Sequence, residues 1–185
     1  DGVTSFDGVS YGASNEFTGT FSDLVIDESG GATLYAGASL ELSSDNDLLL
    51  NSAALSSGDN MTLNAINGSI ETKVGANQGI KVSSGNLELN ASDNFINAGE
   101  VTVELGSMAA EVGVSVANTG TLHAGQNISI SAQNSAALLS FNNTGTLLSE
   151  QSLELGATEI TNSGNIQGTQ GSTVNAAGLT NTGVW

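Results

Sequence analysis

The sequence of 185 residues contains no cysteine, no proline and no arginine. Without cysteine no disulfide can form, so the fold cannot depend on covalent cross-links. Proline averages about 5% of residues in proteins, so its complete absence marks an unusual composition. The 24 glycines and the abundant Ser, Thr, Asn and Ala would suit a disordered chain. However, the mean hydropathy is slightly positive and the aliphatic residues are regularly placed, which indicates a folded chain.

Positive charge is almost absent as well. Lys73 and Lys81 are the only lysines, against 19 acidic residues, and the formal net charge is −17. Nucleic acids and anionic membranes bind proteins through clustered Lys and Arg side chains. The composition therefore argues against both as partners, and the high net charge favours solubility.

Long hydrophobic runs are the third feature that the sequence lacks. No apolar stretch reaches the roughly 20 residues that a membrane-spanning helix needs, so we expect no membrane insertion. The first residues carry no signal-peptide features, and the chain does not begin with Met. We expect a processed or excised segment of a longer chain.

What is present is an internal repeat with the pattern apolar-x-Asn-x-Gly-x-apolar. Its five copies span residues 95–101, 116–122, 141–147, 160–166 and 179–185. A weaker copy at 49–55 has Ala53 in the place of glycine. A second signal, apolar-polar-apolar, begins six residues after the last apolar position of several copies, for example at Ile128-Ser129-Ile130 after Leu122. This second signal extends the repeat into the first half of the chain.

The repeat predicts an all-β solenoid. Short alternating segments place one face of a strand inward, and Gly and Asn between them suit corners. A period near 20 residues with several short strands is typical of coils that hydrogen-bond to their neighbours. We expect residues 34–185 to form these coils and residues 1–33 to form an irregular or capping segment, or extra coils. The coil anchors are Leu34, Leu55, Val82, Val101, Leu122, Leu147, Ile166 and Trp185, which gives coils of about 19–27 residues.

The repeated asparagines are the first candidate site. Their fixed offset from the flanking apolar residues predicts that they stack at one corner, where side-chain amides can donate to and accept from one another. The predicted structural ladder consists of Asn51, Asn97, Asn118, Asn143, Asn162 and Asn181. On the second strand of each coil, Glu41, Glu88 and Glu154 face outward with neutral residues between them, which separates like charges.

Two steps between anchors are longer than the rest, Leu55 to Val82 and Leu122 to Leu147. In solenoids such insertions form surface loops, which are often recognition elements. The first step contains both lysines, so we predict a recognition loop that includes Asn67, Glu71, Lys73 and Lys81. We expect that residues 67–76 can be shortened to a tight turn without unfolding the chain.

Catalytic and metal-binding residues are not predicted. His123 lies between two inward residues, so it points outward, and no second His or Cys accompanies it. Asp45-Asn46-Asp47 lacks the longer ligand series of a calcium loop and suits a solvated turn. Carbohydrate chemistry on a β-helix needs a base with charge-stabilising cations, or a close pair of carboxylates. Since arginine is absent and the outward glutamates are separated, we expect no enzyme activity, no cofactor and no metal.

The repeat resembles the filamentous-haemagglutinin repeats of large two-partner-secreted exoproteins, most closely at residues 118–132. The resemblance covers about residues 31–185. It implies a right-handed parallel β-helix, export through a dedicated outer-membrane transporter, and residence on or outside a Gram-negative cell. These exoproteins include adhesins, haemolysins and the effector stalks of contact-dependent growth inhibition.

The predicted function is a structural and adhesive stalk segment that presents a binding surface away from the cell. Its expected partners are the secretion transporter and a receptor or glycan on a host or neighbouring cell. Two alternatives stay open. One is the stalk or receptor-binding region of a growth-inhibition effector, and the other is a carbohydrate-active β-helix protein.

Overall fold

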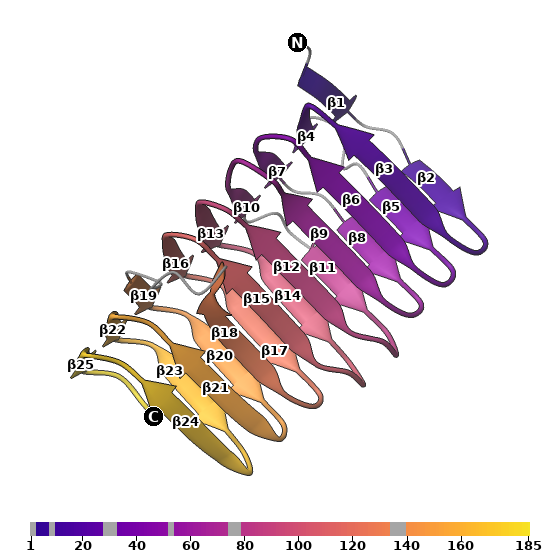
Figure 1. Ribbon diagram of the computed structural model, residues 1–185. Coiled ribbons are helices and arrows are strands. Elements are labelled where there is room, and N and C mark those ends of the chain that lie inside the picture. Colours follow the sequence, from indigo (N-terminus) through magenta and orange to yellow (C-terminus); the bar gives the residue numbers. More distant parts are fainter. Residues whose placement is uncertain (1–2, 8–9, 28–32, 52–53, 74–78, 134–139) are drawn as a thin grey trace.

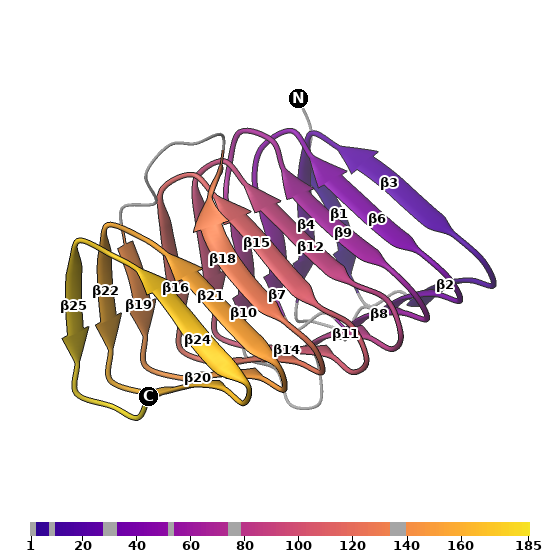
Figure 2. The same cartoon turned by 60° about the horizontal axis from the view of Figure 1, so that its bottom comes forward.

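The computed structural model describes residues 3–7, 10–27, 33–51, 54–73, 79–133 and 140–185. These residues form short strands that stack as successive coils of a parallel β-solenoid (Figure 1). The strands follow one another in a fixed rotation among three sheets, which form three walls around a common core (Figure 2). The predicted all-β solenoid is therefore confirmed. The described part of the chain contains no helix long and apolar enough to cross a membrane.

Each sheet takes one strand from every coil. Sheet A contains β1 (Val3–Asp7), β4 (Asp23–Asp27), β7 (Leu48–Asn51), β10 (Ile70–Lys73), β13 (Asn94–Asn97), β16 (Ser115–Asn118), β19 (Ser140–Asn143), β22 (Glu159–Asn162) and β25 (Gly178–Asn181). Sheet B contains β2 (Ser10–Ala13), β5 (Thr33–Ala36), β8 (Ala54–Ser57), β11 (Gly79–Val82), β14 (Glu100–Val103), β17 (Thr121–Ala124), β20 (Thr146–Ser149) and β23 (Asn165–Gly168). Sheet C contains β3 (Phe17–Phe21), β6 (Leu40–Ser44), β9 (Met61–Ala65), β12 (Leu87–Ala91), β15 (Met108–Val112), β18 (Ile128–Ala132), β21 (Ser152–Gly156) and β24 (Gly171–Asn175).

The core consists of columns of aliphatic side chains that run along the stack. In the strands from β5 to β22, residues at alternate positions are buried, as the period of two requires, whereas β24 and β25 contain no buried residue. In sheet B one column reads Leu34, Leu55, Ile80, Val101, Leu122, Leu147 and Ile166. Each buried Leu or Ile contributes about 1.5–3 kcal/mol relative to an exposed one. Because no strand in the described part of the chain exceeds five residues, packing along this column supplies the stability that a single strand could not.

The column corrects one predicted anchor, because Ile80 and not Val82 aligns with Leu55 and Val101. The segment Gly79-Ile80-Lys81-Val82 offers two inward apolar residues, and the sequence did not decide between them. Val82 lies five residues before Leu87, whereas Ser57 lies four residues before Met61, so the turn after β11 is one residue longer. The steps between anchors are therefore 25 and 21 residues, in place of 27 and 19.

Residues 1–33 had no register in the sequence. In the structure, the described residues of this segment contribute β1 to β4. β2 pairs with β5, β3 with β6 and β4 with β7, all in parallel. Phe17 and Phe21 are partly buried and pack against the aliphatic core. The three walls thus extend through this part of the chain.

Candidate functional site: a buried asparagine column and the outer faces

The asparagine column lies at the carboxyl ends of the sheet A strands. Asn97, Asn118, Asn143, Asn162 and Asn181 are direct partners on successive strands. The first four are at most 1% exposed, and Asn181 on β25 is exposed. An amide buried in an aliphatic core must find hydrogen-bond partners, since leaving one unpaired costs about 1–3 kcal/mol.

Those partners are the neighbouring asparagines, and every bond of the column runs in one direction. Each Nδ2 donates to the Oδ1 of the next asparagine toward the C-terminus, at 2.7, 2.7, 2.8 and 2.8 Å. Each also donates to a backbone carbonyl beyond the corner, as Asn118 does to Thr146 at 3.0 Å. At the N-terminal end, the Thr72 hydroxyl donates to Asn97 Oδ1 at 2.5 Å. The column therefore ties five strands of one wall to the corner backbone.

Asn51 does not belong to this column. On β7 it pairs with Lys73, whereas Leu50 pairs with Thr72 at the column position. The prediction for Asn51 is wrong by one residue, because Leu48, Leu49 and Leu50 are all apolar and their pattern does not show which two face inward. In the structure Leu48 and Leu50 are buried. The Asn51 side chain lies outside the described part.

The glycine of the repeat is explained by close backbone approach at the same corner. A Cβ added to Gly145 would lie 2.1 Å from the carbonyl oxygen of Gly120, on the preceding coil. The same contact occurs at Gly164, 2.1 Å from the oxygen of Gly145. The pattern Asn-x-Gly therefore combines two requirements, a buried amide for the column and a residue without a side chain two positions later.

The predicted recognition loop is not one loop. Ile70, Glu71 and Lys73 lie on β10, a strand of sheet A that pairs with β7 and β13 on its two sides, and Ile70 is fully buried. Asn67 lies in the preceding turn, where its Nδ2 donates to the Asp45 carbonyl at 3.0 Å. Shortening residues 67–76 would remove this wall strand, so the structure gives no support to the expectation that the change leaves folding intact. Residues 74–76 lie outside the described part.

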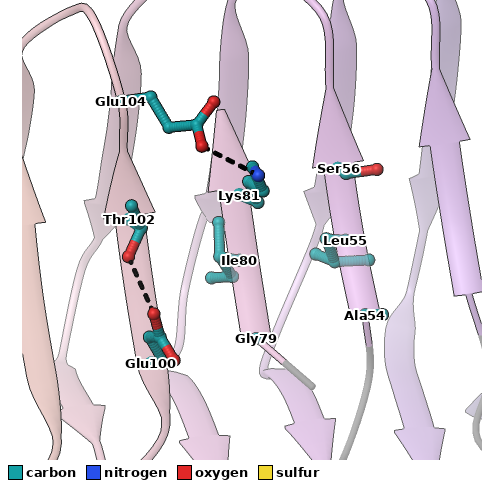
Figure 3. A pocket seen from close by; sticks show the side chains of 9 residues that line it. All are labelled: Ala54, Leu55, Ser56, Gly79, Ile80, Lys81, Glu100, Thr102 and Glu104. Carbon is teal, nitrogen blue, oxygen red and sulfur yellow. Dashed lines mark hydrogen bonds and ion pairs between the residues drawn. The ribbon is translucent and has the colours of Figure 1, made fainter. Parts of the chain in front are cut away.

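Lys81 lies on another wall, at an outward position of β11. Its Nζ is 2.8 Å from Glu104 Oε1, while Lys73 Nζ is 3.5 Å from Glu71 Oε1 on sheet A. Figure 3 shows Lys81 and Glu104 pointing toward each other beside a hollow over β8, β11 and β14. The four predicted recognition residues thus occupy a turn and two separate walls, and each lysine already has an acidic partner.

The outward glutamates lie in one column of sheet C. It reads Thr18, Glu41, Thr62, Glu88, Ala109, Ser129, Glu154 and Thr173. No two glutamates of this column occupy neighbouring strands, so the strands that carry them are at least about 9.6 Å apart along the stack. This spacing reduces repulsion and leaves no close acid pair in the column.

His123 and the Asp45–Asp47 turn also have ordinary partners. His123 lies on the outer side of sheet B with Nε2 3.2 Å from Glu150 Oε1. Asp47 Oδ1 accepts a hydrogen bond from the Ser69 amide at 2.8 Å. Within the described ranges, no group of three or more His, Cys, Asp or Glu side chains could hold a metal ion.

Two further sets of polar side chains were missed in the sequence. The first set lies in the turns that precede the sheet C strands. There, Asn60 Oδ1 accepts from the backbone N–H of Asn86, and Asn86 Oδ1 accepts from the backbone N–H of Ser107. Ser107 Oγ in turn accepts from the backbone N–H of Asn127. These bonds link the turns of successive coils.

The second set lies on the outer side of sheet C. Asn90 Nδ2 donates to Asn64 Oδ1 at 2.9 Å, and Asn64 Nδ2 donates to Ser43 Oγ at 3.1 Å. All three residues follow an apolar-polar-apolar segment directly, so alignment on that segment would have found them.

A column of short parallel strands with ladders at its corners defines a repeat solenoid protein, in which each coil contacts its neighbours. The family model of the haemagglutinin repeat matches residues 24–72 and 49–184, which is most of the chain. The chain therefore belongs to the haemagglutinin repeat family, and the predicted resemblance is confirmed. This is a structural and adhesin family of secreted or surface-exposed bacterial proteins. No curated protein and no solved structure matches the chain.

Proposed function

We propose that the chain is a structural and adhesive stalk segment of a secreted bacterial surface exoprotein. The observation that carries the proposal is the continuous parallel register of all three walls through the described coils. A solenoid in which every coil contacts its neighbours forms a rod, and its outer faces form an extended surface for binding. The eight steps between the nine strands of sheet A span on the order of 40 Å.

The stalk needs two kinds of partner, one for export and one for adhesion. Two-partner secretion proteins use an outer-membrane transporter, and we propose that this chain leaves the cell through such a transporter. The binding partner we propose is a receptor or glycan on a host or neighbouring cell. Membership of the haemagglutinin repeat family supports both. The lysines do not form a basic patch, since Lys73 and Lys81 lie on different walls and pair with Glu71 and Glu104.

The test is attachment by the purified chain. Beads coated with the chain are mixed with epithelial cells and, separately, with Gram-negative bacteria, and bound beads are counted. The matched control is the double variant Asn118→Asp/Asn143→Asp, which places two carboxylates side by side in the core and should unfold the chain. We expect the folded chain to attach well above the control. Equal counts for the folded chain, the control and uncoated beads on both cell types would contradict an adhesive role.

A further inference from the structure

The outer side of sheet C carries a second hollow that differs from the one beside Lys81. It lies over the ends of β6, β9 and β12 and has a volume of about 380 Å³. This volume is at the lower end of the range for small-ligand sites, about 300–1,000 Å³. The side chains that line it include Ser43, Asn64, Ile66, Asn90, Ser92 and Gln133.

The lining of this hollow is uncharged. In a chain with 19 acidic residues, none of the described residues that line it is ionisable, whereas Lys81, Glu100 and Glu104 all line the hollow in Figure 3. Glu111, which pairs with Asn90 on the next strand, lies outside this lining, so the lining itself offers no counter-ion to a charged ligand. The hollow therefore suits a neutral ligand.

The hydrogen-bonding groups of the hollow suit hydroxyl groups. Asn64 and Asn90 are held by the ladder that ends on Ser43, at 3.1 and 2.9 Å. An amide has two donors and a carbonyl acceptor, and this ladder uses only one donor of Asn90. Its second N–H and its Oδ1 can thus donate to and accept from neighbouring hydroxyls, as can the side chains of Ser92 and Gln133.

One apolar side chain completes the hollow. Ile66 is 53% exposed at its rim, although it lies next to the buried Ala65. An exposed aliphatic group beside preordered amides matches a ligand with an apolar C–H face and a polar rim, and a sugar ring has both. The amides are already fixed by the ladder, so little side-chain freedom is lost on binding.

We propose that this hollow, over Ser43, Asn64, Ile66 and Asn90, is a binding subsite for a neutral carbohydrate. The proposal deepens the adhesive function stated above and rests on it. It assigns recognition to the outer side of sheet C, and neither the lysines nor the outward glutamates take part.

The experiment measures binding of uncharged and sulfated oligosaccharides to the purified chain on a glycan array, followed by titration of each hit. Asn90→Ala and Ile66→Ser alter the hollow. Asn175→Ala is the matched control, because Asn175 occupies the same outward column of sheet C at the far end of the stack. Melting curves show whether each variant is folded.

We expect neutral oligosaccharides to bind, Asn90→Ala and Ile66→Ser each to weaken binding at least tenfold, and Asn175→Ala to leave it unchanged. The proposal is overturned if no neutral oligosaccharide binds, if only sulfated ones bind, or if both hollow variants bind as the parent does. The bead attachment assay distinguishes failure of this subsite from failure of the adhesive function. Attachment that survives Asn90→Ala and Ile66→Ser would keep the adhesive function and refute this subsite.

Discussion

At the residue scale, the stability of the corner depends on two residues with different roles. Asn143 is buried and both accepts from Asn118 and donates to Asn162. Gly145 has no side chain, and the neighbouring coil needs that space. Replacing Asn143 therefore leaves buried amide groups unpaired, whereas replacing Gly145 produces a steric clash with the neighbouring coil.

The first prediction concerns the amide. Asn143→Ala leaves the Asn118 donor and the Asn162 acceptor without their partner, and we expect a loss of about 1–3 kcal/mol in the free energy of unfolding. Asn142→Ala is the control, because Asn142 lies next to it on β19 with an exposed side chain, and we expect a change within about 0.5 kcal/mol. Urea denaturation measures both. Equal midpoints would show that the column adds no stability.

The second prediction concerns the glycine. Gly145→Ala forces a Cβ against the Gly120 carbonyl, so the backbone must shift, and we expect a loss of about 1–3 kcal/mol. Gly156→Ala is the control, since its nearest atom would be Ile130 O at an ordinary 3.9 Å. That variant should be neutral or slightly more stable. Thermal melts that rank the two variants the other way would refute the close approach.

At the element scale, the coil and not the strand is the unit of structure. Each strand has four or five residues and pairs mainly with strands of the neighbouring coils. Removal of a whole coil should therefore bring together two coils whose strands can pair in the same register. Removal of one strand instead interrupts the pairing within one sheet.

The third prediction follows from this. Deletion of residues 147–165 joins Thr146 to Ile166 and preserves the sheet B register, in which Leu147 and Ile166 are partners. We expect the shortened chain to keep its β-sheet circular dichroism, with a length about 4.8 Å smaller by X-ray scattering. The contrasting variant lacks residues 67–76, which include β10, and should lose most of its stability. A folded 67–76 deletion or an unfolded 147–165 deletion would contradict the coil as the unit.

How far the sequence predicts these elements depends on the local pattern. Where apolar and polar residues alternate, as at Ile128-Ser129-Ile130, strand and inward face follow directly, and the structure agrees. Where three apolar residues are adjacent, as at Leu48–Leu50, the face is undetermined and Asn51 was misplaced. Hollows on the outer faces are harder to predict from the sequence. Ser43, Asn64 and Asn90 come from three coils, and only the register brings them together.

At the scale of the whole molecule, the net charge of −17 opposes compaction, and the arrangement of charges limits the effect. Glutamates of the sheet C column alternate with neutral residues, which places their spacing close to the screening length of about 10 Å at 0.1 M salt. Both lysines form solvent-exposed ion pairs, with Glu71 and Glu104, and such pairs contribute little to stability.

The fourth prediction concerns salt. Because like charges along the rod repel one another, raising sodium chloride from about 10 to about 500 mM should raise the melting temperature by a few degrees, as screening shortens the range of repulsion. Scanning calorimetry measures the shift. The triple variant Glu41→Gln/Glu88→Gln/Glu154→Gln should show a smaller shift. An unchanged melting temperature would mean that the spacing already removes the repulsion.

Successive coils stack in parallel, with each residue beside its partner on the next strand. The absence of native cysteine allows a direct measurement, the spontaneous oxidation of engineered cysteine pairs. Ala109 and Ser129 are outward partners on β15 and β18, and a strand spacing of about 4.8 Å lies within the Cα separations that disulfides span. Ala109 and Glu154 are two strands apart, beyond the reach of a disulfide. We predict that Ala109→Cys/Ser129→Cys forms an intramolecular disulfide nearly completely, whereas Ala109→Cys/Glu154→Cys does not. Equal oxidation of the two pairs, or oxidation of the second alone, would contradict the register and with it the solenoid described here.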